Sequence, residues 1–156
     1  MPAAKQHIVC TACGAINATT PDRDATAAKC GACAAQLFGR KPADVDAAGF
    51  ERQTKRSDVP VLVDVWAPWC GPCRAMAPMF EAAARVLEPQ VRLIKLNADD
   101  APEISQRYGI RGIPALLLLH RGRLIAQSAG AMDTQRIVAW TRAALSSTQE
   151  TAHDRR

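Results

Sequence analysis

Residues 61–78 read VLVDVWAPWCGPCRAMAP, an apolar run followed by two cysteines that are separated by Gly-Pro. The run up to Trp66 has the length of a strand and is rich in valine, which is typical of a strand buried on both faces. Beyond Cys73, apolar side chains recur every three or four residues as far as Leu87, which predicts an amphipathic helix. Cys70 therefore lies where a buried strand gives way to a helix.

A cysteine pair with this spacing can be half of a zinc site, a structural disulfide or a redox couple. This pair has no second CxxC left to complete a metal site, because the other two such pairs lie together near the N-terminus. A helix N-terminus offers free amide groups and a positive dipole end, which stabilise the thiolate of Cys70. Cys73, one turn into the helix, is placed to attack any mixed disulfide that Cys70 forms. These features favour a redox couple.

The same pattern of strands and helices continues beyond the first helix. Buried strands are predicted for VRLIKLN and ALLLLH, a further strand for RLIAQSAG after an Arg-Gly turn, and helices for DAPEISQRYG and TQRIVAWTRAAL (residues 91–97, 115–120, 123–130, 100–109 and 134–145). Strands separated by helices and followed by a hairpin predict an α/β fold with a mixed central sheet.

The first forty residues differ, because they hold two CxxC pairs and few large apolar side chains. Cys10-Cys13 and Cys30-Cys33 stand sixteen residues apart, a spacing typical of a four-cysteine zinc site. Two structural disulfides, an iron site and unligated thiols are the alternatives. Because so little apolar surface can be buried here, we expect one structural zinc to contribute most of the folding free energy of this lobe.

Glycines support the turns that such a metal site requires. Gly14 follows the first pair and Gly31 lies inside the second, and both residues offer the backbone freedom that tight turns use. No glycine follows Cys33, which is where the second pair departs from the first.

The cysteine content must be judged together with the cellular compartment. No apolar run approaches the roughly 20 residues needed to cross a bilayer, and the N-terminus reaches a cysteine before any segment of signal-peptide length. We therefore expect a cytoplasmic protein without membrane contact, in which CxxC pairs bind metal or act in catalysis. The net charge of +5 is scattered along the chain, so we interpret it as a solvated surface and expect no nucleic-acid binding.

A segment of mixed charge, proline, alanine and glycine at residues 40–49 separates the two modules and suits a connector or a short edge strand. We place an N-terminal zinc-ribbon lobe at residues 1–40, the α/β domain at 41–146 and a flexible tail at 147–156. The lobe has too little apolar area to fold unaided, whereas the α/β domain has strands and helices with a core of their own. We therefore expect it to keep its fold when the lobe loses metal.

Several stretches together resemble the thioredoxin family, in order and at family spacing, across residues 41–146. They are VDVWAPWCGPCRAMAP, KLNADD, YGIRGIPALLLL and the Gly130 of SAGAMD. The two N-terminal cysteine pairs, with AAKCGACAAQLF, resemble the zinc-binding lobe of the bacterial thioredoxin 2 type. The resemblance implies a thioredoxin fold, a mixed sheet flanked by helices, with a small N-terminal zinc-ribbon lobe.

The resemblance also implies roles for individual residues. Cys70 would be the attacking thiol and Cys73 the resolving thiol of a protein-disulfide reductase. Asp64 matches the buried carboxylate that assists proton transfer at Cys73, and Lys95 matches the lysine paired with it. A structural carboxylate at a strand end and a surface lysine are the alternative interpretations of these two residues.

A substrate-binding surface follows from the same resemblance. The family's cis-proline loop offers backbone groups to an extended substrate. The residues implied in binding are Trp69, Gly71, Pro72, Ile113, Pro114 and Gly130. The implied partners are disulfide-containing proteins and a flavin- and NADPH-dependent thioredoxin reductase. We expect a monomer with no organic cofactor, acting in cell redox homeostasis.

Two other functions are compatible with parts of the sequence. An oxidant or isomerase would use the same chemistry, but Gly-Pro between the cysteines and the lack of an export signal favour a reductant. A binding module whose lobe docks a partner would tolerate loss of Cys70. The complete set of matching site residues argues against such a passive scaffold.

Overall fold

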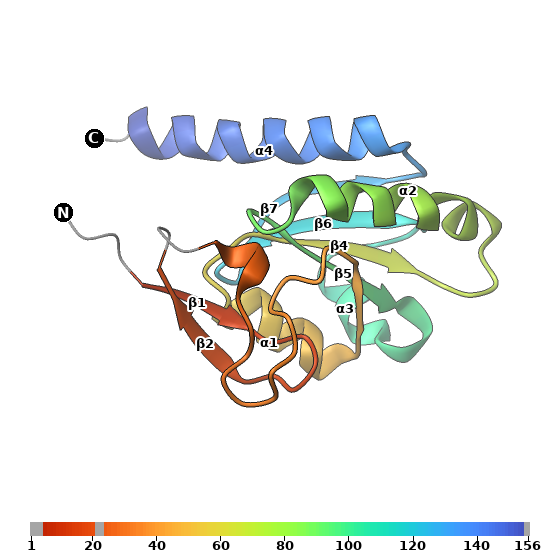
Figure 1. Ribbon diagram of the computed structural model, residues 1–156. Coiled ribbons are helices and arrows are strands. Elements are labelled where there is room, and N and C mark those ends of the chain that lie inside the picture. The colour runs from red at the N-terminus through yellow and green to blue at the C-terminus, as the bar shows by residue number, and fades with distance from the viewer. Residues whose placement is uncertain (1–4, 21–23, 155–156) are drawn as a thin grey trace.

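The computed structural model describes residues 5–20 and 24–154 and is built around a five-stranded sheet with strand order β3-β5-β4-β6-β7 (Figure 1). Its strands are β3 (Ala43–Val45), β4 (Val61–Trp66), β5 (Arg92–Asn97), β6 (Ala115–His120) and β7 (Arg123–Ala129). Strands β3, β5 and β4 are parallel, whereas β6 runs antiparallel to β4, and β7 runs antiparallel to β6. The predicted mixed sheet is confirmed, with β3 as its short edge strand.

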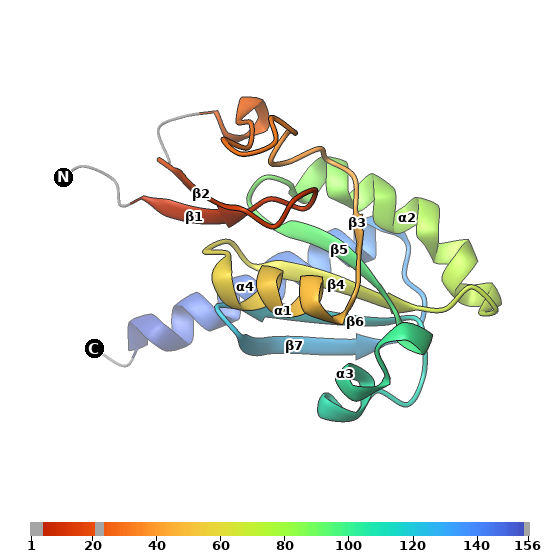
Figure 2. The same ribbon diagram turned by 90° about the horizontal axis from the view of Figure 1, so that it is seen from below.

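Helices cover both faces of this sheet (Figures 1 and 2). They are α1 (Ala47–Arg56), α2 (Gly71–Leu87), α3 (Pro102–Arg107) and α4 (Thr134–Asp154), with short 3-10 turns η1 (Ala25–Ala27) and η2 (Ala98–Asp100). Phe50 of α1 and Ile104 of α3 belong to one core cluster, and Phe80 of α2 and Ile137 of α4 belong to the other. The sheet therefore separates two apolar cores, which is the layered arrangement predicted for buried strands.

Side-chain alternation along β4 decides which core each residue enters. Val61, Val63 and Val65 face the core under α1 and α3, whereas Leu62 faces the core under α2 and α4. Because successive residues of a strand point to opposite faces, Asp64 shares the face of Leu62. The one acidic residue of this buried strand thus lies on the side that α2 covers.

The last helix is longer than the sequence predicted. Helix α4 continues through the segment that was expected to be a tail and ends at Asp154, and residues 155–156 lie outside the described residues. No glycine or proline occurs between Leu145 and Asp154 to end the helix. Among the described residues, no helix combines the length and the apolar character that a bilayer crossing requires.

The N-terminal lobe consists of a hairpin and two cysteine-bearing turns. Strands β1 (Gln6–Val9) and β2 (Ile16–Thr19) pair antiparallel, and a small core holds Ile8, Leu37 and Phe38. Residues 1–4 and 21–23 of the predicted lobe lie outside the described residues. The lobe packs beside the segment that leads into β4, since the His7 amide donates to the Asp58 carboxylate at 2.7 Å. The backbone of His7 therefore helps to dock the lobe.

Candidate active site and metal centre

Helix α2 begins at the cysteine pair. Cys70 is the N-cap residue, and its Sγ accepts a hydrogen bond from the backbone N–H of Cys73 at 3.2 Å. Pro72 occupies the first turn, where the amide hydrogen that proline lacks is not needed for the helix. Cys70 and Cys73 form a disulfide, and their exposed fractions are only 5% and 2%. The sequence thus places a disulfide where amide groups can stabilise a thiolate.

A second loop closes over this disulfide. The Ile113–Pro114 peptide bond is cis, and the Ile113 carbonyl oxygen lies 3.7 Å from the Cys70 Sγ. Gly130, at φ +103°, donates its N–H to the Pro114 carbonyl at 2.8 Å. The loop thus brings Ile113 next to the Cys70 sulfur, and Gly130 is bonded to the adjacent Pro114.

The rim of the site is more exposed than the sulfurs. Trp69 is 66% exposed, and its indole N–H donates to the Asp99 carboxylate at 3.0 Å. Gly71 and Pro72 are exposed next to it. Asp99 was not expected in the site, because an acidic residue in the ADD segment after a strand gives no signal of a partner thirty residues away. The exposed indole ring of Trp69 is thus held at the rim by its hydrogen bond to Asp99.

Asp64 lies beneath α2 in an apolar environment. It is fully buried, and neither of its carboxylate oxygens has a hydrogen-bond partner among the described residues. Desolvation raises the pKa of Asp64 to about 7, although the positive charge of Lys95 opposes this shift. A carboxyl group with this pKa can both accept and donate a proton near neutral pH.

Lys95 supplies the positive charge that acts on Asp64. It lies opposite Asp64 in the pairing of β4 and β5, and its Nζ lies 4.5 Å from the centroid of the Trp66 ring. Cation–π contact of this kind holds an ammonium group in place. The structure therefore brings together the two residues predicted to act as a proton-transfer pair.

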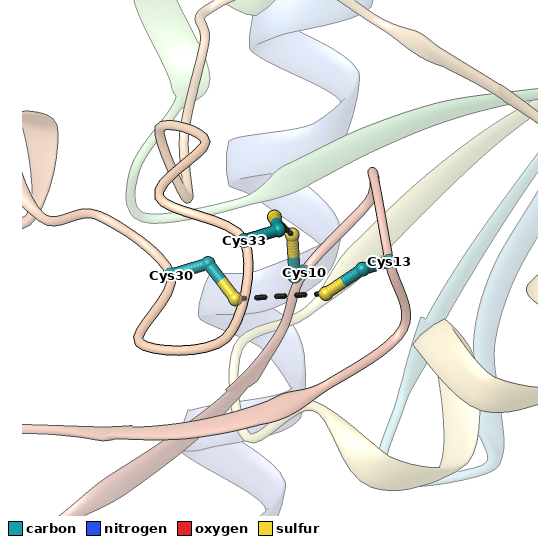
Figure 3. A group of neighbouring side chains, drawn as sticks. All are labelled: Cys10, Cys13, Cys30 and Cys33. Carbon is teal, nitrogen blue, oxygen red and sulfur yellow. Dashed lines mark hydrogen bonds between the residues drawn. The ribbon is translucent and has the colours of Figure 1, made fainter.

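The four N-terminal cysteines converge into one cluster (Figure 3). Their sulfur atoms all lie within 4.8 Å of one another, with Cys10 3.7 Å from Cys33 and Cys13 3.6 Å from Cys30. Thiolates bound to a tetrahedral zinc at about 2.3 Å are about 3.8 Å apart. These residues therefore fit a metal ion of the zinc kind, and the cluster could bind one.

The two cysteine turns have the same backbone geometry. The N–H of Cys10 donates to the Ala15 carbonyl at 2.9 Å, and the N–H of Cys30 donates to the Ala35 carbonyl at 2.8 Å. The amides of the residues inside the two pairs, Ala12 and Ala32, each lie 3.4 Å from a cysteine sulfur. Donors of this kind stabilise the thiolates that a metal requires.

Each cysteine turn contains one residue with a positive φ, and in the second turn this residue is not the glycine that the sequence suggested. Gly14 has φ +79°, as expected, but in the second turn Ala34 takes this position with φ +67°. Gly31 does not adopt a positive φ, so its predicted role in the turn was wrong. The turn needs a left-handed residue after its second cysteine, and the sequence supplies alanine there.

Asn17 joins the two turns and was missed by the sequence reasoning. Its Nδ2 donates to the Cys30 Sγ at 3.4 Å, and its Oδ1 accepts the N–H of Gly31 at 2.9 Å. Hydrogen bonds from Asn17 and from the backbone lower the pKa of the Cys30 thiol to about 6. A polar residue in a hairpin strand carries no sequence signal for this role.

Comparison with known proteins agrees with this geometry. The family model described as Thioredoxin matches residues 41–143. The chain is 35% identical to Thioredoxin C-3 of Corynebacterium nephridii over 133 residues, which cover 85% of this chain and 91% of that protein. It is 42% identical to Thioredoxin 1 of Nostoc sp. over 90 residues, which cover 58% of this chain and 84% of that protein. Since 133 residues cannot fit within residues 41–156, the first similarity extends into the N-terminal lobe.

A solved structure shows the same fold. A mutant thioredoxin from Halobacterium salinarum NRC-1 superposes with a TM-score of 0.60 at 27% sequence identity. The match covers 67% of this chain and 90% of that chain.

Proposed function

The chain belongs to the thioredoxin family, and we propose that it reduces disulfide bonds of other proteins through Cys70 and Cys73. The observation that carries this proposal is the helix-capping sulfur of Cys70 beside the cis Ile113–Pro114 bond. This arrangement combines a stabilised thiolate with a backbone edge that a substrate can meet.

The reaction begins with the reduced protein. The Cys70 thiolate attacks one sulfur of the substrate disulfide, forming a mixed disulfide and releasing the other substrate sulfur as a thiolate. The Cys73 thiolate then attacks the Cys70 sulfur, and the second substrate sulfur leaves. Two electrons have passed to the substrate, and the protein holds the Cys70–Cys73 disulfide seen in the structure.

The second step needs a base, because the Cys73 thiol must give up a proton before its sulfur can attack the Cys70 sulfur. Asp64, buried on the α2 side of the sheet with a pKa near 7, is suited to accept this proton. The charge of Lys95 stabilises the ionised form of Asp64, which is the form that can accept a proton from Cys73.

An extended segment of substrate fits the loop side of the site. The backbone of the cis-proline loop can pair with a substrate strand, and Trp69, Gly71, Pro72, Ile113, Pro114 and Gly130 border it. Trp69, which is largely exposed, supplies apolar contact area at the rim.

The partner and compartment follow from the family. We infer that a thioredoxin reductase, using NADPH, restores the dithiol and that the protein acts in the cytoplasm, where thiols are kept reduced. We also infer that Cys10, Cys13, Cys30 and Cys33 hold one zinc ion, which cross-links the two turns and takes no part in electron transfer.

The reductase activity is tested by insulin-disulfide reduction with NADPH and a thioredoxin reductase, comparing the wild type with Cys70→Ser. We expect NADPH consumption in the wild type and none above background in the variant. Arg136→Met, an exposed substitution on α4, is the control and should keep the activity. Equal activity in the wild type and Cys70→Ser would contradict the proposed function.

A further inference from the structure

A buried arginine stands where the lobe meets the thioredoxin body, which comprises residues 41–154. Arg92 opens β5 with only 2% of its surface exposed, and its guanidinium carbon lies 4.3 Å from the centroid of the Phe38 ring. Its Nη2 donates to the Val9 carbonyl at 3.2 Å. One side chain of the body thus contacts both segments of the lobe that carry the cysteine pairs.

Glu88 completes the buried group. Its Oε2 lies 3.7 Å from Arg92 Nη1, and its two oxygens accept the N–H groups of Leu93 and Arg40 at 3.1 and 2.9 Å. Desolvation raises the pKa of Glu88 and lowers the pKa of Arg92, so each charge depends on the other and on its polar neighbours. A pair this deeply buried is stabilising only while these neighbours remain in place.

The lobe contacts of Arg92 lie next to the metal ligands. Val9 immediately precedes Cys10, and Phe38 packs in one apolar cluster with Cys10 and Cys30. The backbone of Val9 is held twice more by the body, since its N–H donates to Ser57 Oγ at 3.2 Å and its carbonyl accepts from Gln53 Nε2 at 3.1 Å. Any movement that separates the two cysteine turns would therefore disturb the surroundings of Arg92.

We propose that Arg92 couples the metal-binding lobe to the thioredoxin body, so that the body loses stability when the four cysteines are no longer held together. This inference rests on the proposed metal site but not on the proposed reductase activity. It adds to the expectation, drawn from the sequence, that the α/β domain keeps its fold when the lobe loses metal: the fold is kept, but at a lower stability.

The physical reason is the cost of an uncompensated buried charge. While the two turns are tied together, Val9 supplies an acceptor and Phe38 a ring face to the guanidinium. When the tie is lost, these partners are free to leave, and the Arg92–Glu88 pair must be solvated or remain buried with fewer partners. Both outcomes favour the unfolded body. Replacing such a pair by neutral groups removes this dependence.

The coupling acts at a distance from the chemistry. Arg92 pairs with Val61 at the beginning of β4, whereas Cys70 follows the end of that strand. A six-residue strand spans roughly 20 Å. Figure 2 shows the lobe at one end of the sheet and the start of α2 at the other. We therefore expect metal loss to change the stability of the body without changing the geometry of the disulfide site.

Urea unfolding of the full chain, followed by tryptophan fluorescence, tests the proposal. All three tryptophans, Trp66, Trp69 and Trp140, belong to the body, so the signal reports its unfolding alone. A saturating zinc chelator should raise the unfolding equilibrium constant of the wild type by about tenfold or more at fixed urea. The double variant Glu88→Gln/Arg92→Met should respond to the chelator by less than about threefold.

Matched variants separate the buried pair from charge in general. Lys55→Met removes the exposed ammonium group of the i,i+4 pair with the half-buried Glu51 and should show the same response to the chelator as the wild type. Phe38→Leu removes the ring face while keeping both charges, and it should give an intermediate response to the chelator. It serves as the test if the double variant does not fold. Metal released by the chelator is counted in the same samples.

Three results would overturn the coupling. One is a wild-type body whose unfolding does not respond to metal removal. Another is an undiminished response in both Glu88→Gln/Arg92→Met and Phe38→Leu. The third is a reduced wild-type protein that releases no metal, because nothing would then hold the two turns together. Insulin reduction is measured separately, so a failure of the reductase proposal stays distinguishable from each of these.

Discussion

Asp64 lies directly opposite Lys95 across the parallel strands β4 and β5, and its carboxylate accepts no hydrogen bond from the described residues. Desolvation by the apolar surroundings therefore raises the pKa of Asp64 to about 7, and the positive charge of Lys95 opposes this rise only in part. This relationship makes the same residue costly for stability and useful for proton transfer.

Asp64→Asn should stabilise the protein, and the gain should depend on pH. In the unfolded chain the carboxyl ionises near pH 3.8, whereas in the folded protein it keeps its proton up to about pH 7. Folding therefore takes up a proton between these values, and the wild type loses stability as pH rises through this window. The gain should be near zero at pH 4 and on the order of a few kcal/mol at pH 8. Glu81→Gln, an exposed change on α2, is the control in urea unfolding. A gain that is equal at both pH values would contradict the buried titration.

The same substitution should slow product release more than the first attack. Asparagine cannot accept the Cys73 proton, so the rate of the second step should fall by up to about 100-fold and lose its rise near pH 7. Stopped-flow single turnovers from pH 6 to 9 resolve the two steps. Release rates in Asp64→Asn that equal those of the wild type from pH 6 to 9 would show that Asp64 is not the base.

Asn17→Ala should weaken metal binding by roughly 10- to 100-fold, because a donor to the Cys30 sulfur and the link to Gly31 are both lost. Asn17→Asp keeps the acceptor for Gly31 but brings a negative charge to the thiolate, so its loss should be at least as large. Gln36→Ala, an exposed change just after the second turn, should leave the affinity unchanged. Competition with a chromophoric chelator measures all three, and a wild-type affinity in Asn17→Ala would exclude this role.

Ala34→Gly should stabilise the protein, because alanine at φ +67° is strained and glycine is not. The expected gain in the free energy of unfolding is about 1 kcal/mol. Ala32→Gly, in the same turn but outside the left-handed region, should lower stability instead. Thermal unfolding of the metal-loaded chain compares them, and equal effects at both positions would contradict the argument.

Much of the fold could be predicted because its strands are continuous apolar runs and its helices show clear periodicity. The run before Trp66 and the helix after Cys73 place the disulfide correctly with no tertiary information. The cis-proline loop came from resemblance, since no local pattern says that Ile113 returns to the cysteines. The end of α4 was predicted too early, because a polar sequence without glycine or proline can still continue a helix.

The interface between lobe and body could not be predicted. Arg92 and Lys95 both interrupt the apolar segment at residues 91–97, yet Arg92 is buried against the lobe while Lys95 is half-buried beside Trp66. Which of the two becomes buried depends on what covers each end of β5, and that is decided by residues far away in the sequence. Asn17 and Ala34 were missed for a similar reason, because their roles arise only when the two cysteine turns meet.

Trapping of substrate on Cys70 is the most direct test of the proposed mechanism. Cys73→Ser leaves the attacking thiol but removes the one that releases the product, so mixed disulfides with substrate proteins should accumulate and be sensitive to dithiothreitol. Cys70→Ser should accumulate almost none. Both variants are exposed to insulin with intact disulfides and analysed by mass spectrometry without reduction. Insulin chains bound through Cys70 should be found in Cys73→Ser only. The same covalent adducts in both variants, or adducts on Cys73 alone, would contradict the assignment of Cys70 as the attacking thiol.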